Sequence, residues 1–148
     1  MELVTSSAVL SYFTKMEKDV ANLYKNLAEK LPEYRDTFLS LAKESESNVL
    51  AVERAYYSII SDKFEACFIK TLNTDDYNIK VQMPSEIKAS EVLKTVIMME
   101  ENIQKFILDA AKSISVLLPD VSWTLNRIGK KRVDRVTKLK ALLSKTKE

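Results

Sequence analysis

The sequence predicts an all-α protein in which four long helices form two helical hairpins joined by a long crossover. The 148-residue chain has one Gly and three Pro, so few residues interrupt helices. Apolar side chains recur at steps of three and four through four long segments, as on one face of an amphipathic helix. The connections between these segments are short, long and short, and the length suits a single domain spanning residues 1–148.

The first predicted hairpin occupies the first 61 residues. Its first helix is expected to begin after a capping Ser6 or Ser7 and to end near Lys30, because Pro32 cannot continue it. The second helix follows within a few residues, over about Glu33–Ser61, so the two helices should be antiparallel neighbours. The predicted core stripes are Val9, Phe13, Glu17, Val20, Tyr24 and Leu27, and then Phe38, Leu41, Ser45, Asn48 or Val49, Val52, Tyr56 and Ile59.

The helical period is lost over residues 62–84, which predicts a crossover with at most one short helix and with aromatic side chains packed onto the bundle. A third helix is expected from a capping Ser85 to about Leu117, where Pro119 and Asp120 end it and start a fourth. The predicted core stripes here are Leu93, Val96, Glu100, Ile103, Ile107, Ala110 and Ile114, and then Val121, Leu125, Ile128, Arg132, Val136, Leu139 and Leu143.

Two carboxylates interrupt these apolar stripes. Glu17 lies within the first stripe and Glu100 within the third. A lone ionised carboxylate on a buried face costs several kcal/mol unless a metal ion or a cationic side chain neutralises it. The sequence therefore predicts a polar site in the core of the bundle.

The two hairpins form a weak internal repeat around these residues. Met16-Glu17-x-x-Val20 is repeated as Met99-Glu100-x-x-Ile103. Each of the four stripes carries one polar residue near its middle, which predicts that the four converge on one central site. These four residues are Glu17, Ser45, Glu100 and Arg132.

With these features the chain resembles the rubrerythrin and ferritin-like diiron carboxylate family. Residues 17–28 are similar to the first ligand helix of that family, and residues 38–48 are similar to its second. The resemblance implies a ferritin-like four-helix bundle with a Glu on helices 1 and 3 and a Glu-x-x-His motif on helices 2 and 4. Glu17 and Glu100 match the two single-Glu positions.

The other ligand positions of the family do not carry over. Ser45 and Asn48 occupy the motif positions on the second helix, and Arg132 and Arg135 occupy them on the fourth. The chain contains no histidine, and guanidinium cations repel metal ions. We therefore expect no diiron centre, no cofactor and no ferroxidase, peroxidase or iron-storage chemistry.

A Glu/Arg ion-pair cluster is the expected replacement for the metal. Arg132, with Arg135, can bind both carboxylates in bidentate geometry, and two negative and two positive groups sum to zero. The alternative is a single divalent ion held by Glu17 and Glu100 with a neighbour such as Glu46 or Glu101. The predicted core polar cluster is Glu17, Ser45, Asn48, Glu100, Arg132 and Arg135.

The C-terminal part of the chain is strongly basic. The segment from residue 127 onward contains nine Lys or Arg residues and only two acidic residues. The candidate anion-binding residues here are Lys130, Lys131, Arg135 and Lys138. No aromatic residue interleaves with them after Arg127, so a stacking platform for bases is missing and nucleic acid is not the partner expected. A solvated tail is the favoured interpretation, and weak binding of an anion or a nucleic acid through this helix is the alternative.

The remaining features favour a cytoplasmic homodimer with a non-catalytic role. Tyr56, Tyr57, Ile59 and Ile60 place apolar groups on two faces of the second helix, which predicts a contact with the crossover or a second subunit. The single Cys67 forms no internal disulfide, and the chain has neither a signal-like start nor an apolar run long enough to span a membrane. We favour protein interaction or small-ligand binding over enzymatic activity.

Overall fold

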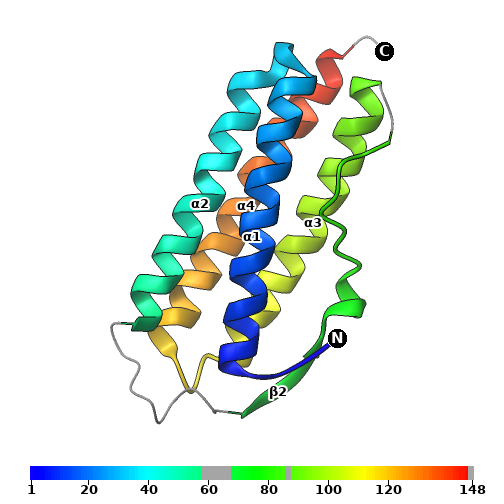
Figure 1. The fold of residues 1–148 in the computed structure, drawn as a ribbon. Coiled ribbons are helices and arrows are strands. Elements are labelled where there is room, and N and C mark those ends of the chain that lie inside the picture. The colour runs from blue at the N-terminus through cyan, green and yellow to red at the C-terminus, as the bar shows by residue number, and fades with distance from the viewer. Residues whose placement is uncertain (58–67, 86–87, 147–148) are drawn as a thin grey trace.

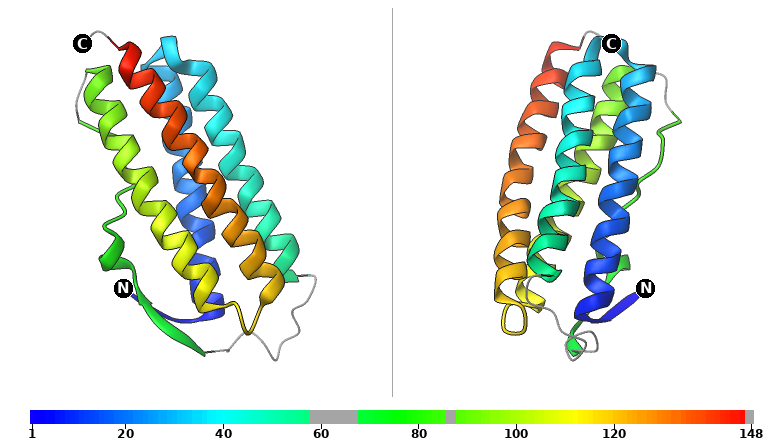
Figure 2. Two further views of the ribbon diagram at one scale, coloured as in Figure 1. Left: turned by 180° about the vertical axis from the view of Figure 1, so that it is seen from behind. Right: turned by 60° about the vertical axis from the view of Figure 1, so that its left-hand side comes forward.

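The computed structural model describes residues 1–57, 68–85 and 88–146, and the four predicted helices are present in it (Figure 1). Helix α1 packs against α2 and α3 packs against α4, so the helices form two antiparallel hairpins. Helix α4 also packs against α2, as the view from behind in Figure 2 shows. This confirms the prediction of four helices in two hairpins. The bounds are α1 Ser6–Lys30, α2 Arg35–Tyr57, α3 Ala89–Ser113 and α4 Pro119–Lys145.

The two hairpins are joined so that α2 and α3 run in the same direction. The chain leaves α2 at one end of the bundle, and residues 68–85 return along α3 to the opposite end, where α3 begins (Figure 1). A crossover of this length is required because two consecutive helices that are parallel cannot be joined by a short turn.

The ends of the first hairpin differ slightly from the predicted ones. Helix α1 begins at Ser6, but its cap is Thr5, whose Oγ1 accepts a hydrogen bond from the Ala8 amide at 3.1 Å. Pro32–Tyr34 forms a separate 3₁₀ turn, so α2 begins two residues after the predicted Glu33. The predicted end of the second helix, including Ile59, lies outside the described residues.

Helix α3 is shorter than predicted at both ends. It begins at Ala89, four residues after Ser85, and no side chain caps it. Ser85 is exposed whereas Ala89 and Ser90 are buried, so packing against the bundle determines where this helix begins. The helix ends at Ser113, and Val116 in the following turn is 92% exposed. The prediction that this helix continues to Leu117, based on the apolar residues among 114–117, was therefore too long by four residues.

A two-stranded antiparallel sheet is the element that the sequence analysis missed. Strand β1, Glu2–Thr5, pairs with β2, Phe68–Asn73, with Leu3 opposite Leu72. The strands are short and lie more than 60 residues apart in sequence, so no hairpin signal announces the pairing. The sheet fixes the N-terminus to the start of the crossover.

Tyr77, in the short 3₁₀ helix η3, Thr74–Tyr77, is one of the crossover residues that attach this segment to the bundle. The Tyr77 ring lies edge-on to Phe106, with centroids 5.4 Å apart, and its hydroxyl donates to Asp109 Oδ2 at 2.6 Å. Phe68 is instead 77% exposed. The expectation that the crossover aromatics pack onto the bundle therefore holds for Tyr77 and is wrong for Phe68, while Phe64 and Cys67 lie outside the described residues.

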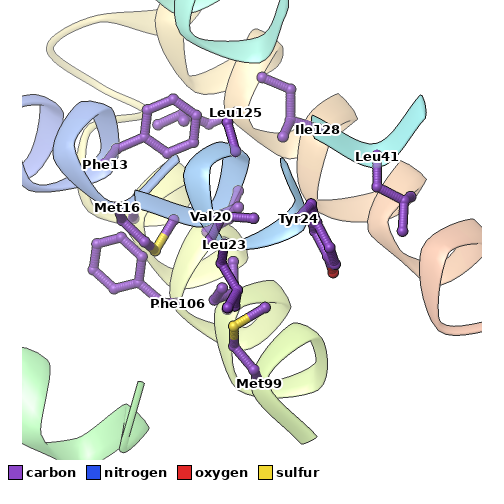
Figure 3. Packing of buried hydrophobic residues seen from close by; sticks show 14 of the residues in the cluster. Phe13, Met16, Val20, Leu23, Tyr24, Leu41, Met99, Phe106, Leu125 and Ile128 are labelled. Carbon is purple, nitrogen blue, oxygen red and sulfur yellow. The ribbon is translucent and has the colours of Figure 1, made fainter. Parts of the chain in front are cut away.

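The interior of the bundle is formed by the predicted stripes (Figure 3). Every residue of the α1 and α3 stripes is buried, and the α4 stripe is buried as far as Leu139. Large aliphatic and aromatic side chains each contribute about 1.5–3 kcal/mol when removed from water, so this core is the main source of stability. Figure 3 shows Phe13, Val20 and Tyr24 of α1 among core side chains from the other helices.

Gly129 permits a close approach of α4 to α3. A Cβ atom at this position would lie 2.8 Å from Leu108 Cδ2 and 3.2 Å from Ile107 Cγ2. The site three residues further along α4 is Arg132, so the tight contact brings this side chain near the centre of the bundle. Among the described residues, no helix is long and apolar enough to cross a membrane.

Candidate functional site: a buried Glu/Arg cluster

Three helices place charged side chains at the centre of the core. Glu17 lies on α1, Glu100 on α3 and Arg132 on α4, and each is at most 1% exposed. Each occupies a position in its apolar stripe, so the helical period that buries its neighbours also buries the charge. The cluster therefore sits within the hydrophobic core rather than at its edge.

Arg132 binds both carboxylates directly. Its Nη1 and Nη2 donate to Glu17 Oε2 and Oε1, each at 2.8 Å, which is a bidentate pair. Its Nε donates to Glu100 Oε2 at 2.6 Å. Charge-assisted bonds of this geometry are about twice as strong as neutral ones. One side chain thus neutralises two carboxylates from two other helices.

Glu100 has two further partners. The Tyr24 hydroxyl donates to its Oε1 at 2.5 Å, and Arg135 Nη1 donates to the same oxygen at 3.2 Å. Arg135 is itself 1% exposed, and its Nε donates to Glu44 Oε1 at 2.9 Å. Glu44, on α2, is 33% exposed, so the chain of charges runs from the core to the surface between α2 and α4.

The two polar residues predicted on α2 differ in their contacts. Asn48 Nδ2 donates to Glu17 Oε2 at 2.8 Å, which gives that carboxylate a third hydrogen bond. Ser45 is fully buried, but its Oγ has no hydrogen-bond partner among the described residues, and neither has Nη2 of Arg135. Hydrogen bonds link five of the six predicted cluster residues, all except Ser45.

The charges explain the pKa values of the group. Burial by itself would raise the pKa of Glu100, but the charges of Arg132 and Arg135 and the hydrogen bond from Tyr24 outweigh it, so the pKa is lowered. Burial also acts to lower the pKa of Arg132, whereas the carboxylates of Glu100 and Glu17 raise it above its already high value. Both ions therefore remain charged in the folded protein.

Tyr24 remains neutral for the opposite reason. Burial raises the pKa of its hydroxyl well above the ordinary value, and the adjacent charge of Glu100 raises it further. A neutral hydroxyl can donate to the carboxylate, and this is the bond that the structure contains. Tyr24 therefore serves as a fixed donor and not as an acid or base at neutral pH.

The residues present do not suit a metal ion. The cation between Glu17 and Glu100 is the guanidinium of Arg132, and it occupies oxygens of both carboxylates. Glu46 and Glu101, the neighbours considered for a single divalent ion, are exposed, and Glu46 pairs with Lys25 at 2.9 Å. In the described part of the chain, no three His, Cys, Asp or Glu residues are grouped as metal ligands.

The basic C-terminal residues separate into two environments. Lys130, Lys131 and Lys138 are exposed on α4, as an anion-binding surface requires. Arg135 is buried and paired with two carboxylates, so it belongs to the core cluster and not to the basic surface. Its inclusion among the anion-binding candidates is not supported by this position.

Two members of the cluster were missed by the sequence analysis. Tyr24 was read only as a packing aromatic, although it lies two helical turns from Glu17 on the same stripe. Glu44 was not considered because it precedes the stripe residue Ser45 and its neighbours are polar. The sequence carried no signal for Glu44, because the charges of Glu17, Glu100, Arg132 and Arg135 already sum to zero.

The fold and the site define this chain as a four-helix protein of two hairpins with a buried Glu/Arg salt-bridge cluster. No protein-family model, no curated protein and no solved structure matches the chain.

Proposed function

We propose that this chain is a non-catalytic binding protein built on a ferritin-like arrangement of helices, in which an arginine has replaced the metal centre. The observation that carries the proposal is the position of Arg132, which bonds to Glu17 and to Glu100 at the centre of the core. A metal ion at this place would need the same carboxylate oxygens. The chain has no histidine, and Arg132 occupies the carboxylate oxygens, so the site does not offer the ligand set that ferritin-like enzymes use to hold a redox metal.

The path of the chain supports the ferritin-like part of the proposal. The two hairpins with a long crossover along α3, and the parallel directions of α2 and α3, are the connectivity expected of that arrangement. The placement of one polar residue per stripe also agrees with it, because Glu17, Ser45, Glu100 and Arg132 are all buried and Arg132 pairs with both carboxylates. The cluster then has a structural role, holding three helices in register.

The surface of the bundle, and not its interior, is where we propose that a partner binds. The interior is filled by the apolar core and the ion pairs, so activity must depend on the surface. We propose a homodimer that uses α2, where Leu50 is 51% exposed and Tyr57 is 71% exposed. Leu39 on the same helix is also exposed. Apolar groups of this size are common in subunit interfaces.

The experiment that tests the absence of a metal site compares the protein with a variant that lacks the internal cation. Elemental analysis and calorimetric titration with Fe²⁺, Mn²⁺ and Zn²⁺ should show no stoichiometric binding to the wild-type protein. Arg132→Ala removes the guanidinium and leaves Glu17 and Glu100 facing each other, so Mn²⁺ should stabilise this variant against heat. Arg127→Ala, an exposed change on the same helix, is the matched control and should not respond.

Two results would contradict the proposal. Two iron atoms per chain, or rapid oxidation of added Fe²⁺ by the wild-type protein, would show that a metal centre forms despite Arg132. A divalent ion bound tightly by the wild-type protein and lost on Glu17→Gln would favour the alternative of a single-metal site.

A further inference from the structure

A basic groove lies between α2 and α4, on the side of the bundle where Glu44 reaches the surface. It has a volume of about 400 Å³, and three cations line it: Lys43 from α2, and Arg127 and Lys131 from α4. Two serine hydroxyls, of Ser40 and Ser47, line the same groove. The groove thus offers several hydrogen-bond donors and three positive charges to a ligand.

The cations of the groove are not neutralised within the described part of the chain. No carboxylate there lies within 4.0 Å of Lys43, Arg127 or Lys131. The one carboxylate that lines the groove, Glu44, is bound to Arg135. Grouped cations repel one another, so an anion from outside the protein is attracted to this place.

An exposed tryptophan continues the groove along α4. Trp123 is 66% exposed, and the Arg127 guanidinium lies over its ring, 5.3 Å from the centroid. Trp123, Arg127 and Lys131 are spaced by four residues, so they share one face of the helix. A second hollow of about 400 Å³ is lined by these three residues, by Lys130 and Asn126, and by one carboxylate, that of Asp134, so cations outnumber acidic groups there by three to one. The aromatic ring and the cations therefore form one continuous surface.

We infer that this surface, which we call the Trp123 groove (Lys43, Trp123, Arg127, Lys130 and Lys131), binds single-stranded nucleic acid. Phosphates would pair with the Lys and Arg side chains, and a base would stack on the Trp123 ring. Basic grooves with an aromatic stacking residue are the common solution for binding single strands without sequence preference. The inference rests on the proposed binding role and names the class of partner for it.

The composition of the groove favours nucleic acid over an acidic protein. Protein interfaces depend on a buried apolar centre, and besides Trp123 the two hollows offer only Ile128 and Ala51 as apolar lining residues. Trp123 also supplies the stacking residue that the sequence analysis did not find, because no aromatic residue follows Arg127 in the basic segment. Trp123 precedes that segment by one helical turn and joins it only on the helix surface.

The test measures the fluorescence anisotropy of labelled oligo(dT) and oligo(U) of about 15 nucleotides, a length within the usual site sizes. Lys43→Gln, Arg127→Gln and Lys131→Gln together should weaken binding about tenfold or more. With three phosphates engaged, the logarithm of the affinity should fall with the logarithm of salt concentration with a slope of about −2, and the triple variant should nearly abolish the slope. Trp123→Leu should weaken binding about tenfold with little change of slope.

The matched control removes the same number of charges elsewhere. Lys80→Gln, Lys105→Gln and Lys112→Gln, all exposed and away from the groove, should leave binding within about twofold. Equal losses in the two triple variants, or no oligonucleotide binding at about 50 mM salt, would overturn the inference. Binding of poly-glutamate without binding of oligonucleotide would also overturn it but would leave the proposed binding role intact, whereas a metal-loaded wild-type protein would overturn that role independently.

Discussion

Arg132 and Glu17 form a bidentate ion pair in the core although 115 residues separate them in the sequence. Both side chains are at most 1% exposed, and the pair connects α4 to α1 through the interior of the bundle. Because Arg132 also bonds to Glu100, one guanidinium holds α1, α3 and α4 in a fixed register. The following predictions test this arrangement and the surfaces around it.

Replacement of Arg132 by Met should destabilise the protein by about 3 kcal/mol or more at neutral pH, because Glu17 remains buried without a cation and Glu100 keeps only Arg135. A like charge and burial both favour protonation, so the variant should regain part of its stability as the pH falls. Urea unfolding at several pH values measures both effects. A variant as stable as the parent would mean that the ion pair does not form in solution.

A double-mutant cycle tests whether the pair is coupled. Glu17→Gln combined with Arg132→Met should be less damaging than Arg132→Met alone, because Glu17→Gln removes the carboxylate that Arg132→Met leaves without a cation. The free energies of unfolding of the parent, the two single variants and the double variant supply the coupling. Strict additivity is the result that would rule out a direct interaction.

The lowered pKa of Glu100 should be visible in how the stability of the protein depends on pH. Its pKa is lowered in the folded protein by Arg132 and Arg135 against the effect of burial, so its contribution is present above the unfolded value of about 4.3 and is lost as the pH falls below it. Glu100→Gln should be less stable at pH 7, and its stability should fall less between pH 5 and pH 3. Glu101→Gln, at the exposed neighbouring position, is the control and should follow the parent.

Tyr24→Phe should lower the free energy of unfolding by about 1.5–3 kcal/mol, because a buried hydrogen bond to a charged acceptor is lost. The raised pKa of Tyr24 also predicts that its hydroxyl ionises only when the protein unfolds. In an alkaline titration followed by tyrosinate absorbance, the parent and Tyr24→Phe should therefore show the same absorbance change as long as the protein is folded. After unfolding, the parent should show the absorbance of six tyrosinates and the variant that of five.

The proposed dimer should dissociate when charge is placed on α2. Leu50→Glu is expected to convert the dimer into a monomer, whereas Met98→Glu, at a position on α3 that is also exposed, should leave the mass unchanged. Light scattering coupled to size-exclusion chromatography at micromolar concentration measures both. A monomer mass for the parent protein would show that α2 is not an interface under these conditions.

The positions of the helices and of the central cluster could be read from the sequence because both depend on a local period. A step of three or four residues buries Val9, Phe13 and Glu17 together, whatever partner they meet. The same period located Arg132 as the counter-ion of the buried carboxylates. Helix ends were predicted less well, since Ser85 offers a capping side chain that the folded chain does not use.

The partners of the second arginine and the pairing of the strands were decided by the tertiary structure alone. Arg135 finds Glu44 on α2 and Leu3 pairs with Leu72, and both contacts join segments far apart in sequence. The partners of Tyr24 and the surroundings of Trp123 could not be predicted from the sequence either. The Tyr24 hydroxyl donates to Glu100 on α3, and Trp123 lies beside Arg127 and Lys131, which also line the hollow that contains Lys43 of α2. A period along one helix determines which face is buried, but the contact made by that face depends on how the helices are packed together.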